Sequence, residues 1–181
     1  LAQRCADKGV QFLYGHDVLR LERHGNAINS VAVRANHPGA AGQKDQILQG
    51  DAIVVACGAY SAPLLRNVGV DLPIYPGKGY SATFPILRPE AAPTVSALDD
   101  GRKIAISRLG NQLRVAGTIE LGGFDTALDT PVAKARCHML SRRIEELFPG
   151  VCDTRTDEQG GNPQYWTGLR PATPTNIPFI G

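Results

Sequence analysis

The stretch of sequence that decides the fold is Lys103-Ile-Ala-Ile-Ser-Arg-Leu-Gly-Asn-Gln-Leu-Arg-Val-Ala-Gly-Thr-Ile-Glu120. Its two halves are rich in apolar and β-branched residues, which predicts strands over Lys103–Arg108 and Gln112–Glu120. The dipeptide Gly110-Asn111 between them is a hairpin turn signal. The sequence therefore predicts an antiparallel sheet in this part of the chain.

A strand and a long helix flank this hairpin. Tyr80–Pro85 reads as a further strand, and Pro131–Phe148 reads as a helix with Pro131 in its first turn. Asp129 or Thr130 is placed to cap that helix. Apolar residues at helical spacing predict its buried face, namely Val132, Ala135, Met139, Ile144, Leu147 and Phe148.

The N-terminal part alternates short helices and strands. The predicted helices are Leu1–Lys8, which stops at Gly9, and Ala62–Val68, which stops at Gly69. The predicted strands are Val10–Tyr14, Val18–Arg23, Ile28–Arg34 and Gln46–Gln49. A polar loop rich in Gly, Pro and Ala over His37–Lys44 joins the last two.

Ala52–Cys57 differs from these strands because it is almost wholly apolar and does not alternate. Such a run is typical of a strand buried on both faces of a parallel sheet. We expect the other strands of that sheet to lie outside this chain. Leu72–Gly79 holds two prolines and two glycines and predicts a boundary between two lobes.

Composition narrows the class of protein. The length suits one domain or two small lobes, and the formal net charge of +2 gives no electrostatic case for nucleic acid. Four cysteines without a Cys-x-x-Cys pair predict free thiols, and neither a zinc site nor a disulfide framework. No apolar run is long enough to span a bilayer. The chain begins at Leu1 and stops just after an apolar run, so we expect a fragment.

The segment Tyr165–Gly181 holds a single charged residue, Arg170, among prolines and glycines. A rigid frame around one planar guanidinium suits bidentate capture of a carboxylate. The plainer alternative is a strand end whose arginine reaches the surface.

Three segments together resemble the FAD-dependent D-amino-acid oxidase superfamily, and within it the bacterial D-amino-acid dehydrogenases of the small-subunit type. They are Asp51-Ala-Ile-Val-Val-Ala-Cys-Gly-Ala-Tyr-Ser61, Pro76-Gly-Lys-Gly-Tyr-Ser81 and Trp166-Thr-Gly-Leu-Arg-Pro-Ala-Thr-Pro-Thr-Asn-Ile-Pro-Phe-Ile-Gly181. The resemblance spans essentially the whole chain.

The resemblance implies an α+β chain with a mixed, largely antiparallel sheet and helices, plus part of a Rossmann-like lobe. Residues 1–72 would be a partial FAD-binding lobe, residues 73–170 the substrate-binding lobe, and residues 171–181 a return towards the FAD lobe. The Gly-x-Gly-x-x-Gly phosphate turn of such proteins is absent from the sequence. FAD would therefore belong to the full-length protein, and we expect the isolated chain to bind it weakly or not at all and to be inactive.

The resemblance also implies roles for particular residues. Arg170 would hold the substrate carboxylate, and Val18, Ala56, Cys57 and Gly58 would contact FAD. The aromatic residues Tyr80, Tyr165 and Trp166 are predicted to line an apolar substrate pocket. Alternatively, these are ordinary core, turn and packing residues. Lys78 is predicted to be a solvated turn lysine, with a side chain that reaches the flavin or the substrate as the alternative. No residue, the four histidines included, is assigned a catalytic role.

The implied activity of the full protein is oxidation of a D-amino acid to a 2-oxo acid and ammonia by hydride transfer to FAD. The implied partners are the small-molecule D-amino acid and a respiratory electron acceptor. The implied location is the cytoplasm, with peripheral association at the inner membrane. Two alternatives remain: a glycine or sarcosine-type amine oxidase of the same superfamily, and a non-catalytic binding module with a degenerate flavoprotein fold.

Overall fold

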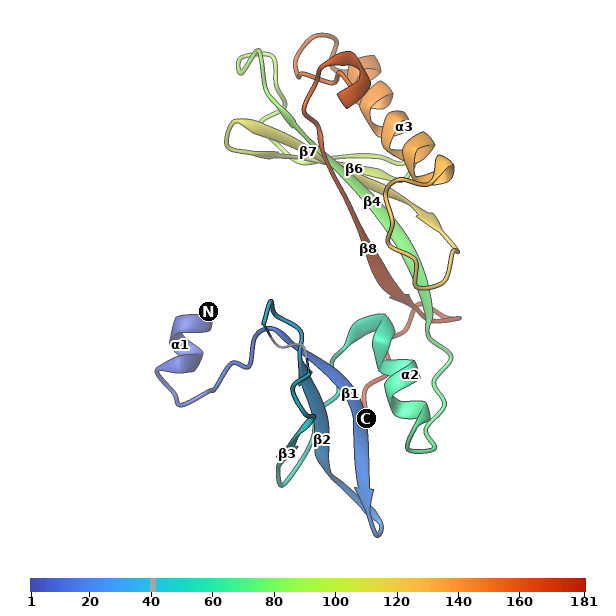
Figure 1. Cartoon of the computed structure of the whole chain (residues 1–181). Helices are drawn as coiled ribbons and strands as arrows, with labels where there is room; N and C mark the ends of the chain where they lie inside the picture. The colour runs from blue at the N-terminus through green and yellow to red at the C-terminus, as the bar shows by residue number, and fades with distance from the viewer. Residues whose placement is uncertain (40–41) are drawn as a thin grey trace. The chain divides into compact units, whose positions relative to one another are not determined.

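The computed structural model describes residues 1–39 and 42–181, which form two compact units, residues 1–73 and residues 74–181 (Figure 1). Ala40 and Ala41, within the predicted loop His37–Lys44, lie outside the described residues.

The first unit is built on a three-stranded antiparallel sheet in the order β1-β2-β3. Its elements are α1 (Ala2–Ala6), β1 (His16–His24), β2 (Ala27–Ala35), β3 (Gln46–Gln49), the short 3₁₀ helix η1 (Gly58–Tyr60) and α2 (Ser61–Arg66). Helix α2 packs against β1, and the unit's core is small, with Leu21, Ala32 and Val33 buried in the sheet and Leu64 on the helix. The predicted strands at 18–23, 28–34 and 46–49 and both helices are confirmed.

Two strand predictions in this unit are wrong. Val10–Tyr14 has no strand partner in the described residues. Ala52–Cys57 is also not a strand, and Val54 is 89% exposed. An apolar run becomes a strand only when a neighbouring strand satisfies its N–H and C=O groups, and no described strand lies beside this one.

The second unit has a five-stranded sheet in the order β5-β6-β7-β4-β8, and each of its described strand pairs is antiparallel. Its elements are β4 (Tyr75–Pro85), β5 (Ala97–Asp99), β6 (Ile104–Leu109), β7 (Gln112–Glu120), α3 (Pro131–Leu147), η2 (Asp157–Gln159) and β8 (Gln164–Ala172). The predicted hairpin is confirmed, since Leu109 pairs with Gln112 and Gly110 takes a φ of 62°. The α+β class, with largely antiparallel sheets, is confirmed as well.

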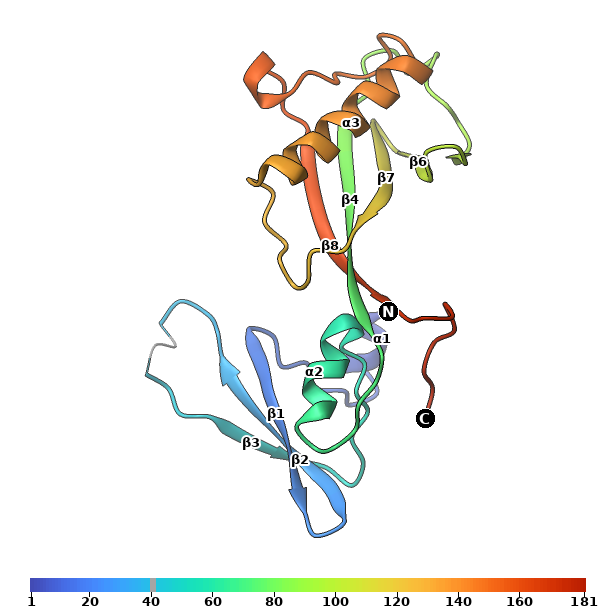
Figure 2. The same ribbon diagram turned by 90° about the vertical axis from the view of Figure 1, so that its right-hand side faces the viewer.

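Helix α3 covers one face of this sheet, across β4 and β7 (Figure 2). The Thr130 side chain caps it by accepting a hydrogen bond from the Ala133 amide at 3.2 Å. The buried face differs from the predicted one, because Val132 is half exposed. It consists of Ala133, Cys137, Leu140, Ser141 and Ile144. No helix of the described chain is long and apolar enough to cross a membrane.

Strand β4 divides its side chains between the two faces of the sheet, as strand geometry requires. Tyr80, Ala82 and Phe84 point towards α3 and form the core. Gly77, Gly79, Ser81 and Thr83 alternate with them and belong to the other face. We call that face, which α3 does not cover, the open face.

Candidate functional site

Arg170 lies on the open face, in strand β8, opposite Gly77 of β4. Its Nη1 donates a hydrogen bond to the carbonyl oxygen of Thr118 at 3.0 Å. Within the described residues we find no second acceptor for this guanidinium. The remaining N–H groups of the planar fork are therefore available to a ligand acid group.

Gly79 makes room for this guanidinium. A Cβ placed on Gly79 would lie 2.9 Å from Arg170 Cζ, 3.0 Å from Nη2 and 3.2 Å from Nη1. Ordinary contacts between non-bonded atoms are about 3.5–4.0 Å. The guanidinium thus rests where a side chain at position 79 would stand, and any larger residue there must displace it.

Trp166 lies on the same face and rests on Gly168 in the same manner. A Cβ on Gly168 would lie 2.9 Å from both Cζ2 and Cζ3 of the indole. Gly79 and Gly168 are cross-strand partners, so their Cβ positions are about 5 Å apart. The structure therefore brings Arg170 and Trp166 together above one glycine pair, on an exposed surface where Trp166 is 59% accessible.

A bulge in β7 supplies the carbonyl that holds Arg170. The pairing of β4 with β7 shifts register between Lys78 and Tyr80, and Thr118 takes a φ of 59°. Such a conformation is costly for a residue other than glycine and persists where the surrounding structure imposes it. The Thr118 hydroxyl is also buried without a hydrogen-bond partner in the described chain. Backbone strain of this kind clusters at functional sites.

The opposite face holds a buried polar cluster beneath this bulge. Tyr80 donates a hydrogen bond to Glu120 Oε2, and Arg136 Nε of α3 lies 3.6 Å from the same oxygen. Lys78 is only 1% exposed, and its Nζ donates to the Ala127 carbonyl at 2.6 Å. The prediction that Lys78 is a solvated turn lysine is therefore wrong, because position 78 lies inside β4 and not in a turn.

Tyr80 is separated by the sheet from Arg170 and Trp166, with which the sequence grouped it. It is 1% exposed and faces α3. Burial raises the pKa of Tyr80 and the hydrogen bond to Glu120 raises it further, so the hydroxyl stays protonated and remains a donor. Tyr80 thus supports β7 from behind the site and does not line it.

The residues proposed to contact FAD belong to the first unit. Val18 is half exposed in β1, and Ala56 and Cys57 are exposed just before η1. The Cys57 amide donates to Ser61 Oγ at 3.1 Å, and its carbonyl accepts from the Tyr60 amide. Gly58 has a φ of 57°, and a Cβ there would meet nothing within 4 Å. This open backbone leaves room for the close approach of a cofactor. The sequence has no Gly-x-Gly-x-x-Gly turn.

The model of one family, DAO, described as "FAD dependent oxidoreductase", matches residues 1–181. The chain belongs to this family.

Its relatives include the D-amino acid dehydrogenase of Dechloromonas aromatica (strain RCB), which is 46% identical over 181 residues, or 100% of this chain and 40% of the relative. The D-amino acid dehydrogenase of Methylobacterium radiotolerans is 41% identical over the same 181 residues, which are 39% of its length. The chain thus spans about 40% of the curated relatives it matches.

Solved structures support the same fold. The chain superposes on glycine oxidase from Bacillus cereus with a TM-score of 0.71 and 19% identity, covering 99% of this chain and 44% of that one. L-proline dehydrogenase from P. horikoshii gives a TM-score of 0.69 and 17% identity, with 99% and 44% of the two chains covered. At these identities the likeness concerns the fold alone.

Sequence reasoning singled out Arg170 and Trp166 but not Gly79, Gly168 and Thr118, which the structure places beside them. The two glycines carry a signal in the sequence, since a glycine inside a strand often marks close approach by another group. Thr118 carries none, because a bulge depends on how two distant strands pair.

Proposed function

We propose that this chain is part of a flavoprotein that oxidises D-amino acids, with Arg170 binding the substrate carboxylate. The observation that carries the proposal is the Arg170 guanidinium, fixed over Gly79 by the Thr118 carbonyl and free to bind an acid on an exposed face. The identity of 46% to a D-amino acid dehydrogenase over the full chain supports the substrate class.

Arg170 acts by orientation. A fork-shaped pair with a carboxylate fixes both the position and the direction of the substrate, and positioning of this kind supplies a large share of enzymatic rate. Trp166, beside the guanidinium, offers an apolar wall for the rest of the amino acid. Gly79 and Gly168 have no side chains, so substrate atoms can approach the backbone of the sheet closely there.

The first unit would contribute contacts to FAD through Val18, Ala56, Cys57 and Gly58, as the partial FAD-binding lobe of residues 1–72. Residues 73–170 would form the substrate lobe, and residues 171–181 would return towards the FAD lobe. When bound in the full-length protein, FAD supplies the acceptor for the hydride that leaves the substrate Cα. The Cys57 amide is already bonded to Ser61, so any main-chain donor at this turn would come from a neighbouring residue.

The product of the reaction would be an imino acid, which water converts to a 2-oxo acid and ammonia. A respiratory acceptor, and not oxygen, would then reoxidise the flavin. The main alternative is a glycine or sarcosine-type oxidase of the same fold, which would pass its electrons to oxygen.

The test is turnover by the full-length, FAD-loaded protein under anaerobic conditions with a dye acceptor. We expect oxidation of D-alanine and no oxidation of L-alanine. Strict dependence on oxygen would favour the oxidase, and absence of flavin reduction by every D-amino acid tested would leave the non-catalytic binding module.

A further inference from the structure

The open face carries a second feature beside Arg170, a pocket of about 430 Å³. Ser81 and Thr83 of β4 form its floor, with Arg114 of β7 on one side and Gln164 and Trp166 of β8 on the other. Its lining combines these polar side chains with Leu109, Tyr165 and the indole of Trp166, so it is less apolar than the lining typical of small-molecule pockets.

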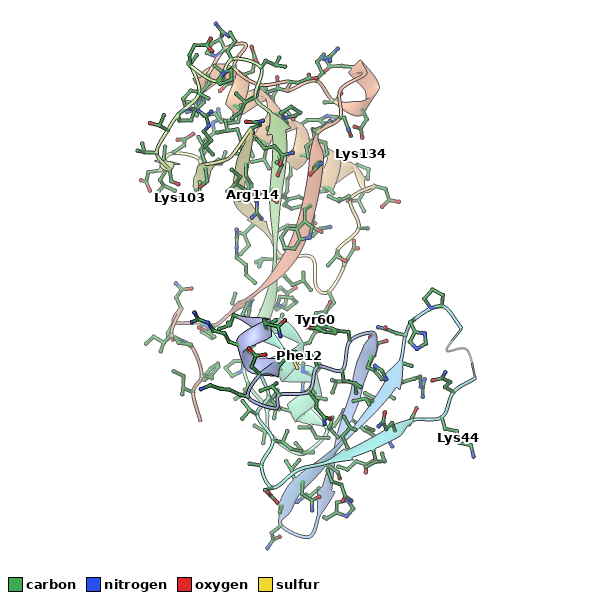
Figure 3. The ribbon with its side chains drawn as sticks, turned by 90° about the vertical axis from the view of Figure 1, so that its left-hand side faces the viewer. Phe12, Lys44, Tyr60, Lys103, Arg114 and Lys134 are labelled. Atoms are coloured by element: carbon green, nitrogen blue, oxygen red, sulfur yellow. The ribbon has the colours of Figure 1, made fainter. Side chains whose placement is uncertain are left out.

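Arg114 is a cation without a partner in the described chain. It stands opposite Thr83 of β4 and Ser107 of β6, and no ion pair or hydrogen bond of its guanidinium occurs within residues 1–39 and 42–181. Figure 3 views the sheet from the side away from α3, with Arg114 among the side chains of that face. Most other arginines of the second unit are engaged, as Arg108 is with the Gly110 and Pro89 carbonyls.

Ser81 is a second unpartnered group in the same pocket. It is 3% exposed and lines the pocket, yet its hydroxyl has no hydrogen-bond partner among the residues that the structure describes. The oxygen is not among the fully buried side-chain atoms without a partner in the described chain, so a group in the pocket can reach it. Ser81 and Arg114 therefore offer two donors at one place, which suits an anionic or strongly accepting ligand group.

The pocket adjoins the position of the Arg170 guanidinium. Ser81 is the next residue after Gly79 on this face, about 7 Å along β4, and Thr83 lies about 13 Å from Gly79. Trp166 is the cross-strand partner of Ser81, so it borders both the pocket and the glycine pair. A ligand held by Arg170 at one end reaches the pocket by extending along β4 past the indole.

We propose that this pocket binds the side chain of the substrate and that Arg114 selects D-amino acids with a side-chain carboxylate. The inference rests on the proposed function and specifies its substrate class. The Arg170 guanidinium rests over Gly79, and Arg114 stands opposite Thr83, about 13 Å further along β4. With the Arg114 guanidinium level with Thr83 and each carboxylate about 2.8 Å from its guanidinium, about 7 Å remains for the ligand. That length matches an extended five-carbon dicarboxylate such as D-glutamate.

The first test is binding without turnover, measured on the full-length, FAD-loaded protein by perturbation of the flavin absorbance. Glutarate carries two carboxylates and butyrate only one, so we expect glutarate to bind about 10- to 100-fold more tightly, the worth of a charge-assisted hydrogen bond. The substitution Arg114→Gln should remove this preference and leave butyrate binding unchanged. Ser81→Ala should reduce the preference to a smaller extent.

Arg108→Gln is the matched control, because Arg108 belongs to the same hairpin but is bound to main-chain carbonyls. It should leave the preference for glutarate intact. FAD content and melting temperature, measured on every variant, identify any that fails to fold, and Ser81→Ala then carries the test alone.

The second test compares kcat/KM for D-glutamate and D-alanine. Arg114→Gln should lower the D-glutamate value about 10- to 100-fold with little effect on D-alanine. Equal affinities for glutarate and butyrate in the unmodified protein would overturn this inference, and D-alanine turnover would still uphold the proposed function. Loss of both substrates in Arg114→Gln, with FAD content and melting temperature unchanged, would also overturn it.

Discussion

The substitution Gly79→Ala should weaken substrate binding without unfolding the protein. The added methyl group would lie within 2.9–3.2 Å of three atoms of the Arg170 guanidinium. That group is the far end of a flexible side chain, so it can yield by about 0.5–1 Å to reach ordinary contact distances. Gly79 also lacks the positive φ that a side chain would resist.

Gly79→Ala should change the stability of the protein less than it changes substrate affinity. Because the backbone accepts alanine, we expect the free energy of unfolding to change by no more than about 1 kcal/mol. Displacing the fork from its place costs one charge-assisted hydrogen bond to the substrate carboxylate, about 1.5–3 kcal/mol. That loss corresponds to a dissociation constant for the substrate raised about 10- to 150-fold.

Gly117→Ala is the matched comparison in the neighbouring strand. A Cβ there would lie 2.6 Å from the Lys103 carbonyl oxygen and 2.9 Å from Ile104 Cα. Both are main-chain atoms, which cannot move without distorting the strand. Overpacking of this kind destabilises by about 1–3 kcal/mol. We therefore expect Gly117→Ala, and not Gly79→Ala, to lower the midpoint of urea unfolding markedly.

The assay measures both quantities on full-length, FAD-loaded proteins: unfolding in urea, and D-alanine affinity from anaerobic flavin bleaching. The reasoning fails if Gly79→Ala leaves the affinity unchanged at full FAD occupancy. It also fails if that variant unfolds as readily as Gly117→Ala.

Three further expectations concern stability and thiol chemistry. Leu140→Ala removes a fully buried side chain beneath the sheet and should lower the free energy of unfolding by about 2–5 kcal/mol. Val132 is half exposed, so Val132→Ala should lower it by about 0.5 kcal/mol or less. Equal losses would contradict the observed buried face of α3. The Arg143 guanidinium, 2.7 Å from Asp99, lowers the pKa of the Asp99 carboxyl. The ionised carboxylate therefore stabilises the fold above its unfolded pKa of about 4. This stabilisation is lost as the pH falls through the lower pKa of the folded state. The melting temperatures of the unmodified protein and Asp99→Asn should therefore converge in acid, and a gap that widens on acidification would refute this. Burial raises the pKa of Cys137 and of Cys152 to about 11, so iodoacetamide at pH 8 should modify neither until the protein unfolds, as peptide mass spectrometry would report; rapid native labelling of Cys137 would exclude the buried position.

Local patterns were sufficient to predict the β6–β7 hairpin of the second unit and most of β4, but not β5 or β8. The Gly110-Asn111 turn and its two flanking strands depend on neighbouring residues alone, and so does the Thr130 cap of α3. Arg170 was singled out because it is the single charge in a frame of prolines and glycines. In each case the physical cause lies within a few residues of its signal.

The errors have a non-local cause. Whether Tyr80 shares a face with Arg170 depends on the register between β4 and β8, whose residues are far apart in the chain. Lys78 was misjudged for the same reason, since the strand begins earlier than its prolines and glycines suggest. The apolar character of Ala52–Cys57 indicates burial but does not supply the neighbouring strand that would bury it.

The same dependence on pairing explains why the bulge at Thr118 was not foreseen. Its positive φ arises where β7 must accommodate one more residue than β4. Glu120, fixed by Tyr80 and Arg136 on the other face, anchors the strand just beyond the bulge. The position of Arg170 therefore depends on contacts from both faces of the sheet.

The most direct measurement of the central claim is the dissociation constant of D-alanine for the full-length, FAD-loaded Arg170→Lys protein, obtained from the rate of anaerobic flavin reduction. Lysine keeps the positive charge but loses the planar fork, so the account predicts affinity weakened about 10-fold or more, with FAD content and melting temperature retained. An unchanged dissociation constant would contradict the assignment of Arg170 as the carboxylate anchor.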